Sequence, residues 1–195
     1  GDEATYGEID FPEDLPRMVA VDADGYQTTA LSEDGRVFKW GEANEGSQKY
    51  VPPGLSNVTQ IANGAYITAA VTKDHRVFVW GIVDQTQPKK FTAEVKMLAP
   101  VAYQLVYLGM DGKIYGEVPS SSLNYKYKPQ PEIPGEIVKL AGSGSMVAAI
   151  NDEGNLYVWG SYDPQVQHSR GLIIDVPNNL PPVADVALDG ESIVC

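Results

Sequence analysis

The 195-residue sequence has almost no cysteine, since its single thiol, Cys195, is the last residue. One cysteine excludes an intrachain disulfide and a metal site built from several cysteines, and it leaves the redox compartment undetermined. Long apolar runs are missing as well: none approaches the ~18 residues that span a bilayer, and no signal-peptide pattern opens the chain. We therefore expect a soluble protein without membrane insertion, whose localisation is unknown.

Basic residues are also scarce. Lys and Arg together number 14 against 26 Asp and Glu, which gives a formal net charge of −12. An acidic surface repels the phosphate backbone of DNA and RNA. Direct nucleic-acid binding is therefore not expected.

Glycine and proline are frequent, with 19 and 14 residues, which indicates many tight turns. The turns belong to one pattern written four times, around the turn acids Asp34, Asp74, Asp111 and Glu153, which are separated by 40, 37 and 42 residues. The copies are A30-L-S-E-D-G-R-V-F-K-W-G41, A70-V-T-K-D-H-R-V-F-V-W-G81, Y107-L-G-M-D-G-K-I-Y-G-E-V118 and A149-I-N-D-E-G-N-L-Y-V-W-G160. Such a spacing is typical of propeller blades or solenoid units.

Each copy predicts three β-strands, such as V19-A-V, Y26-Q-T-T-A-L and R36-V-F-K-W in the first unit. The Asp-Gly joint predicts a two-residue hairpin, and His75 replaces its glycine once. Pro-containing stretches such as V51-P-P-G-L are candidates for an outer edge strand. The residues that recur in register are assigned to the scaffold: Asp34, Gly35, Trp40, Gly41, Asp74, Trp80, Gly81, Asp111, Gly112, Gly154, Trp159 and Gly160.

The two ends of the chain read as parts of one further unit. The stretch V186-A-L-D-G-E-S-I-V-C195 begins a fifth copy and stops halfway, and Thr5-Tyr6-Gly7 matches a third strand. We therefore predict one all-β domain over residues 1–195, a β-propeller of about five blades that closes when this N-terminal strand pairs with the C-terminal half-blade. The predicted repeats are 10–50, 51–90, 91–130, 131–175, and 176–195 together with 1–9. The alternative is an excerpt of a larger propeller, for example one with seven blades.

The pattern A-L-x-x-D-G-x-V-F-x-W-G, preceded by V-x-x-I-A-x-G, resembles the repeat of the regulator of chromosome condensation superfamily, which implies a β-propeller. The resemblance covers nearly the whole chain, and the short repeat is nearer to the compact type of propeller-type β-lactamase inhibitory proteins. Two features depart from the family pattern. The His that commonly follows Ala-Gly is replaced by Tyr26, Tyr66, Tyr103 and Ser145, and Glu117 stands in place of a Trp.

Residues that carry catalytic chemistry are few. The two histidines, His75 and His168, do not recur beside a Ser or Asp at a spacing typical of a catalytic site. V21-D-A-D-G25 begins like a calcium loop but lacks the further ligands, so a strand end near the propeller axis explains it better. We expect no catalytic residue, no metal site and no cofactor. An enzyme remains as an alternative only through carboxylates in an axial channel: Asp22, Asp24, Asp185 or Asp189.

Tyrosines that do not repeat give the functional prediction. They follow the third strand of three units, in polar segments that differ in every copy, and the candidate partner-binding residues are Tyr50, Tyr125, Lys126, Tyr127 and Tyr162. Tyrosine offers a large amphipathic contact area at low entropic cost. We therefore predict a non-enzymatic module that binds a protein partner of unknown identity, as a single domain or as part of a larger chain or assembly. Alternatives are an enzyme inhibitor like the β-lactamase inhibitory propellers, a structural or adhesive domain of a virion or cell surface, and a guanine-nucleotide exchange factor.

Overall fold

The computed structural model describes residues 12–24, 27–41, 51–64, 66–81, 89–102, 104–117, 131–144, 146–160, 176–177, 179–188 and 193–195. Within these ranges the chain forms five small antiparallel sheets, one for each predicted unit. They contain no helix that is long and apolar enough to cross a membrane. The predicted all-β fold class is confirmed.

Each sheet is one blade, and its strands follow one another in sequence. Blade 1 contains β1 (Met18–Asp24), β2 (Gln27–Ser32) and β3 (Val37–Gly41), and blade 2 contains β4 (Val58–Asn63), β5 (Ile67–Thr72), β6 (Arg76–Gly81) and β7 (Lys89–Thr92). Blade 3 contains β8 (Val95–Val101), β9 (Gln104–Gly109) and β10 (Ile114–Glu117), and blade 4 contains β11 (Ile137–Ser143), β12 (Met146–Asn151) and β13 (Leu156–Gly160). Blade 5 contains β14 (Ala187–Leu188) and β15 (Ile193–Val194).

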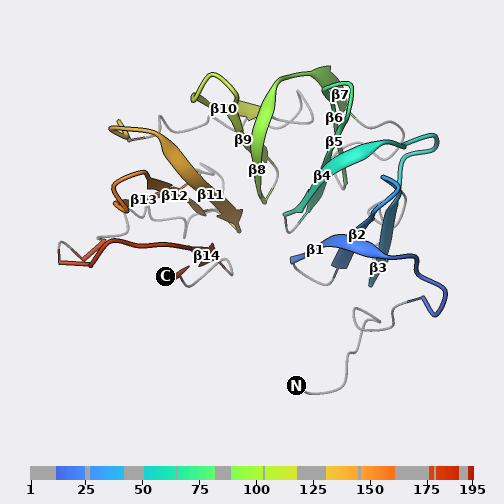
Figure 1. The fold of residues 1–195 in the computed structure, drawn as a ribbon, viewed down its shortest axis with the longest axis horizontal. Coiled ribbons are helices and arrows are strands. Elements are labelled where there is room, and N and C mark those ends of the chain that lie inside the picture. The colour runs from blue at the N-terminus through green and yellow to red at the C-terminus, as the bar shows by residue number, and fades with distance from the viewer. Residues whose placement is uncertain are drawn as a thin grey trace, which may run out of the picture.

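The blades are arranged as a fan around a common centre (Figure 1), and the first strand of each blade is the innermost one. These inner strands contact one another in order, β1 with β4, β4 with β8, β8 with β11 and β11 with β14. Radial stacking of similar sheets is the arrangement of a β-propeller. The described sheets form an arc that is not closed into a ring.

The hairpin turns adopt the conformation that the Asp-Gly motif predicts. Gly35, Gly112 and Gly154 have φ angles of 80°, 78° and 79°, and His75, which replaces the glycine in blade 2, has a φ of 61°. Glycine adopts positive φ without steric cost, and histidine is among the residues that tolerate it. The four turns are therefore equivalent in backbone conformation as well as in sequence.

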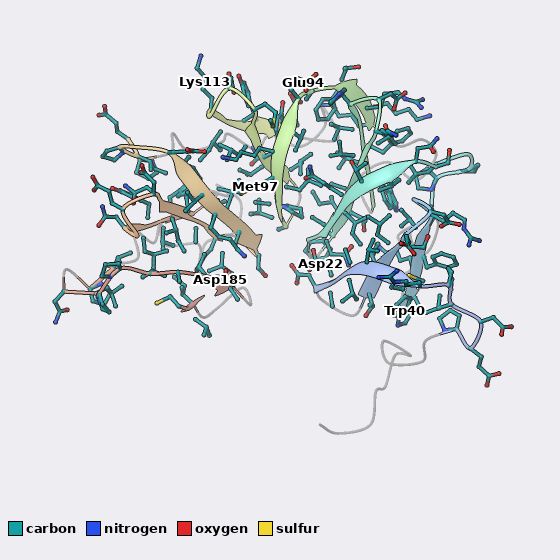
Figure 2. All side chains as sticks on the ribbon, viewed as in Figure 1. Asp22, Trp40, Glu94, Met97, Lys113 and Asp185 are labelled. Carbon is teal, nitrogen blue, oxygen red and sulfur yellow. The ribbon has the colours of Figure 1, made fainter. Side chains whose placement is uncertain are left out.

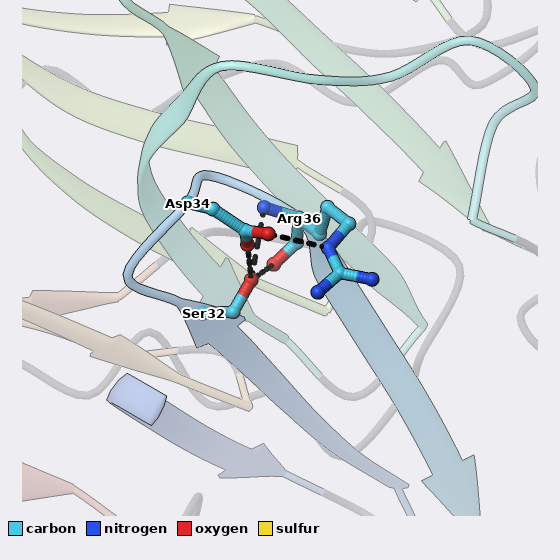
Figure 3. Close-up of polar contacts among 3 residues, drawn as sticks. All are labelled: Ser32, Asp34 and Arg36. Atoms are coloured by element: carbon cyan, nitrogen blue, oxygen red, sulfur yellow. Dashed lines mark hydrogen bonds and ion pairs between the residues drawn. The ribbon is translucent and has the colours of Figure 1, made fainter. Parts of the chain in front are cut away.

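The turn acid of blade 1 is held by its neighbours on both sides of the turn (Figure 3). The Ser32 hydroxyl donates to Asp34 Oδ1 at 2.5 Å and accepts from the Arg36 backbone N–H at 3.1 Å, while Arg36 Nε lies 2.8 Å from Asp34 Oδ2. The hydroxyl and, to a lesser degree, the guanidinium hold the pKa of Asp34 below its usual value. Blade 2 repeats the arrangement, with Thr72 donating to Asp74 at 2.5 Å.

The prediction of an outer edge strand in the Pro-containing stretches is wrong for V51-P-P-G-L. That stretch forms a turn, in which the Leu55 N–H donates to the Pro52 carbonyl at 3.1 Å. Within the described residues a fourth strand forms in blade 2, where β7 occupies the equivalent place and contains no proline. Proline lacks the N–H that a strand ladder needs, which explains the difference.

The hydrophobic core is divided among the interfaces between blades. Between blades 2 and 3, Ile67 and Val79 pack against Leu105 and Tyr107. The interfaces between blades 1 and 2 and between blades 3 and 4 combine buried aliphatic residues with a tryptophan, and Trp80 and Trp159 are only 6% and 7% exposed. Both tryptophans belong to the clusters at these interfaces. Trp40, on the face of blade 1 that no described blade covers, is half-buried.

The inner strands approach so closely that small residues are required. A Cβ atom added to Gly142 in β11 would lie 2.8 Å from the carbonyl oxygens of both Ala99 and Pro100 in β8. A Cβ on Gly64, just after β4, would lie 3.1 Å from the Val101 carbonyl oxygen. Side chains larger than hydrogen at these positions would separate the backbones. The blades therefore converge most tightly at the carboxyl ends of their inner strands.

The first and fourth blades meet across the centre. The Ser143 hydroxyl at the end of β11 donates to Asp24 Oδ2 at the end of β1, at 3.2 Å. In Figure 1, β14 lies between β11 and β1 in the fan. The predicted partner of blade 5, Thr5-Tyr6-Gly7, falls outside the described residues, so closure of the ring stays a prediction.

Deletion of residues 1–9 tests closure. Because the deletion would leave two sheet edges without a partner, we expect the shortened protein to self-associate and to melt several degrees lower. Light scattering after size exclusion and thermal denaturation measure both effects. Deletion of residues 1–3, which retains the predicted strand, is the matched control. An unchanged monomer with an unchanged Tm after the longer deletion would show that the strand does not close the ring.

Candidate functional site

A cavity of about 580 Å³ lies at the centre of the fan, and all five inner strands contribute to its wall. Small and aliphatic residues form much of the wall, and charged and polar side chains are placed among them. The lining residues that carry the chemistry are Asp22, Asp24, Asn63, Lys139 and Ser143. We call this space the axial cavity. Its volume falls within the range of about 300–1,000 Å³ that is usual for small-molecule sites.

The axial cavity extends along the inner strands from their middle, at Leu98 in β8 and Lys139 in β11, to the end of the blades where these strands finish. In blade 1, Asp24 at the end of β1 pairs with Gln27, which in turn pairs with Gly41 at the end of β3. The same pairing brings Ser143 and Gly160 together at the start of β12 in blade 4. We call this end of the molecule the cavity face, and the opposite end, which carries the four hairpin turns, the turn face.

The segments that differ from unit to unit begin at the cavity face. They follow Gly41, Gly81, Glu117 and Gly160, the last residues of the third strand in four blades. The predicted partner-binding residues Tyr50, Tyr125, Lys126, Tyr127 and Tyr162 all lie in three of these segments, outside the described residues. The structure therefore places the attachment points of the segments on one face, beside the axial cavity, and leaves the five side chains as predictions.

Asp22 is the most constrained carboxylate in the cavity wall. Its Oδ2 accepts the Asn63 backbone N–H at 2.8 Å, and its backbone carbonyl accepts the Asn63 Nδ2 at 2.8 Å. Burial raises the pKa of Asp22 above its usual value, and the backbone hydrogen bonds from Asn63 and Ala23 offset part of that shift. The carboxylate is thus held in place by neutral donors. Their hydrogen bonds stabilise its ionised form by less than burial destabilises it.

Asn63 connects Asp22 to the interior of the interface between blades 1 and 2. Its Oδ1 accepts hydrogen bonds from the hydroxyls of Thr29 at 2.9 Å and Thr68 at 3.1 Å. The amide oxygen of Asn63 therefore accepts two hydrogen bonds, and its Nδ2 donates one to the Asp22 carbonyl. Together these hydrogen bonds fix the orientation of the buried side chain.

Lys39, in β3, lies at the end of this network that is away from the axial cavity. Its amine contacts the Thr68 hydroxyl and lies 5.9 Å from the centre of the Trp80 ring. Desolvation by burial lowers the pKa of Lys39 to about 7. No carboxylate of the described residues pairs with this amine.

The network occupies positions that are apolar in the other blades. Asp22 stands where blades 2 to 4 have Ala62, Ala99 and Ala141, and Lys39 stands where blades 2 and 4 have Val79 and Val158. Sequence reasoning missed Lys39 and Asn63 as site residues because they are in the predicted strands, whereas the predicted binding residues are in the segments that follow the third strands. In an alignment of the repeats, Lys39 could have been recognised as a polar residue at a position that is apolar in blades 2 and 4.

Of the four carboxylates predicted for the axial channel, two line the axial cavity. Asp22 and Asp24 line the axial cavity, whereas Asp185 forms an ion pair with Lys139 at 2.7 Å, which lowers the pKa of Asp185. Asp189 lies outside the described residues. No cluster of three or more His, Cys, Asp or Glu that could hold a metal ion occurs in the described ranges. His75 is placed on the turn face, 3.2 Å from Glu94.

Substitution of Asp22 tests its desolvation. Because burial raises its pKa, the ionised carboxylate costs stability at neutral pH, and this cost disappears as the pH falls below the usual Asp value. Asp22→Asn keeps an acceptor for Asn63, so we expect an equal or higher Tm at pH 7 and no difference from wild type near about pH 3. Thermal denaturation followed by circular dichroism measures this.

The matched control is Asp34→Asn, which should act in the opposite direction. The Ser32 hydroxyl lowers the pKa of Asp34, so its ionised form contributes stability above the usual Asp value. That variant should melt lower at pH 7. If Asp22→Asn is destabilised as much as Asp34→Asn, the carboxylate of Asp22 is not strained by burial.

Substitution of Lys39 tests the buried amine. The native amine loses its proton near pH 7 and the unfolded one near about pH 10.4, so the wild type should gain stability as the pH rises between these values. Lys39→Met should be more stable at pH 7 and should lack this rise. Urea denaturation across that range measures it, with the exposed Lys73→Met as control. A flat profile for the wild type would contradict the burial of the charge.

Comparisons with known proteins bear on the fold. No model of a known protein family matches the chain, and no similar curated protein is found. Solved structures do match: Prp20p of Saccharomyces cerevisiae (TM-score 0.60, 20% identity), yeast RCC1 (Prp20) bound to Kap60 (0.59, 19%) and human WBSCR16 (0.57, 19%). Each match covers 77% of this chain.

These likenesses show that the chain has the β-propeller fold of the RCC1 type. The fold implied by the sequence resemblance to the regulator of chromosome condensation repeat is therefore confirmed. The chain spans less than half the length of these structures, with 46%, 44% and 49% of their residues matched.

Proposed function

We propose that the chain is a non-enzymatic recognition module that binds a protein partner with its cavity face. The observation that carries this proposal is the separation of the two faces. The turn face repeats the same hairpin conformation in four blades, with an Asp–Arg ion pair in blades 1 and 2, whereas the segments that start at the cavity face differ in every unit. Binding residues are commonly found on variable loops that a rigid scaffold positions.

The residues proposed for contact are Tyr50, Tyr125, Lys126, Tyr127 and Tyr162. Tyrosine is enriched at the energetic centres of protein interfaces because it combines apolar area with a hydrogen-bonding hydroxyl. The segments attach to three blades around a cavity that is lined by both polar and apolar residues. A partner that touches several segments at once would bury a continuous area at the centre of the face.

Protein binding is also the activity named for the similar structures. One shows yeast RCC1 (Prp20) bound to Kap60, and another concerns the binding of Prp20p to Gsp1p and histones. The net charge of −12 favours a protein partner with a basic contact surface over a nucleic acid. The proposal extends this general use of the fold to the present chain without carrying over the individual partners.

Tyrosine substitutions on the cavity face test the proposal. Tyr125→Ala/Tyr127→Ala should reduce the amount of partner captured from extracts of the source cells at least tenfold, because aromatic anchors carry much of the energy of an interface. Quantitative mass spectrometry after affinity capture measures it. Circular dichroism should show unchanged melting, since the core clusters of the described residues include neither tyrosine.

Met110→Ala is the matched control, since Met110 is an exposed apolar residue in a hairpin turn on the turn face. It should capture the partner as the wild type does. Loss of capture in the Met110 variant and retention in the tyrosine variant would place the binding surface on the turn face. A turnover that depends on Asp22 would contradict the non-enzymatic assignment.

A further inference from the structure

We propose that the axial cavity binds an alkyl guanidinium or ammonium group, presented by an arginine or lysine side chain of the partner. The proposal rests on the proposed function for the source of this group. The chemistry of the cavity is independent of that source, since it follows from the residues of the wall. Three features carry it: an incompletely compensated carboxylate, a neutral support that holds the carboxylate in place, and apolar walls beside it.

The carboxylate of Asp22 lacks a cationic partner. The ion pairs of the described residues include none with Asp22, and its carboxylate oxygens receive backbone N–H groups alone. An ionised carboxylate has about four acceptor sites, so sites remain for a charged donor. The raised pKa of Asp22 is consistent with this lack of compensation. A guanidinium or ammonium group in the cavity would supply the missing positive charge.

The hydrogen bonds that hold Asp22 in position are present in the unliganded protein. Asn63 donates to Asp22 through two groups and is itself held by Thr29 and Thr68. These residues lie in the packed interface between blades 1 and 2, where Asn63 and Thr68 are buried. A carboxylate held this way needs little reorganisation on binding. In the equivalent column, the other blades have alanine in place of Asp22, so the carboxylate is specific to this position.

The rest of the wall favours a cation with an apolar stem. Leu98, Leu140 and Leu188 line the cavity together with several alanines, and they suit the methylene groups of a long side chain. Asp24 contributes a second carboxylate, which accepts a hydrogen bond from Ser143. Lys139 is the one cation among the lining residues, and its charge is balanced by Asp185 at 2.7 Å. The wall therefore carries an excess of negative charge and would repel an anion.

The proposed side chain enters from the cavity face. The lining residues of blades 1 to 4 extend from the middle of β8 and β11 to the carboxyl ends of the inner strands, and the variable segments begin at the same face. Figure 2 shows Asp22 near the centre of the fan, whereas Glu94 and Lys113 lie at its outer rim. A side chain that enters at the centre would do so on the face where the tyrosine-bearing segments attach, after Gly41, Glu117 and Gly160. Under the proposed function, charge recognition at the centre and contact with the tyrosines would then act on one partner.

A titration with a small probe tests the cavity without the partner. The probe is N-acetyl-arginine N-methylamide, added to the full-length protein labelled with nitrogen-15. We expect it to shift the backbone amide signals of cavity residues such as Ala62, Ala99 and Leu140. N-acetyl-citrulline N-methylamide has nearly the same shape without the charge, and it should bind at least tenfold more weakly. Equal shifts with both compounds, or no shifts at the cavity, would overturn the proposal.

Charge-matched variants identify the carboxylate. Asp22→Asn should weaken binding of the arginine probe about tenfold, which corresponds to the loss of one charge-assisted hydrogen bond. Glu94→Gln removes the same charge at the outer rim and should leave the affinity unchanged, apart from the small screened effect of net charge. Equal weakening in both variants would show a general attraction to an acidic protein and would overturn the site. Thermal denaturation confirms that both variants are folded.

Competition with the captured partner tests the source of the group. Saturating arginine probe should release the partner from the wild type, and the citrulline compound should not. If the probe binds the cavity but leaves capture intact, the assignment to a partner side chain is wrong. If the probe binds and capture is also insensitive to the tyrosine substitutions, the proposed function fails while the cation site stands. The two hypotheses are therefore separable.

Discussion

The structure depends on the packing of one blade against the next. A sheet of three short strands buries too little apolar surface to be stable alone, and the described core is accordingly divided among four interfaces, each shared by two blades. Each fully buried aliphatic side chain contributes about 1.5–3 kcal/mol at such an interface. The repeated Trp, Val and Ala positions exist to make these interfaces, which is why they recur and why they say little about binding.

Packing at the interfaces also creates the axial cavity. Close approach of the inner strands requires residues as small as Gly142, which would collide with the Ala99 carbonyl if it carried a Cβ atom. Small side chains at converging strand ends leave space between the strands, and this space is the cavity. The same geometry sends the chain out of each blade at this end, after Gly41 in the first blade and Gly160 in the fourth. The stacking of the blades thus places the axial cavity and the attachment points of the variable segments on one face.

Repetition made most of the fold predictable. The Asp-Gly joints fixed the hairpins, and even His75 could be expected at positive φ because it replaces a glycine in register. V51-P-P-G-L was mispredicted, because the register alone does not say whether proline leaves enough N–H groups for a strand. The contact of Asp22 with Asn63 joins residues 41 positions apart in neighbouring blades, and no local pattern encodes it. The tyrosine-bearing segments lack periodicity, so sequence reasoning could select them as distinctive but could not place them.

The polar network between blades 1 and 2 is the main exception to apolar packing, and its cost has a consequence for function. Lys39 replaces a valine and Asp22 an alanine, and burial shifts the pKa of both groups toward their neutral forms. Charged groups that are desolvated without a partner reduce stability. At Lys39 the deficit lies in the interface between blades 1 and 2, away from the residues that line the cavity. The carboxylate of Asp22 lines the cavity, so a bound cation would stabilise its ionised form. Binding would then remove the free-energy cost that burial of this charge imposes on the unliganded protein, and this gain would add to the affinity. The residue that lowers the stability of the scaffold would therefore strengthen the binding of a cation.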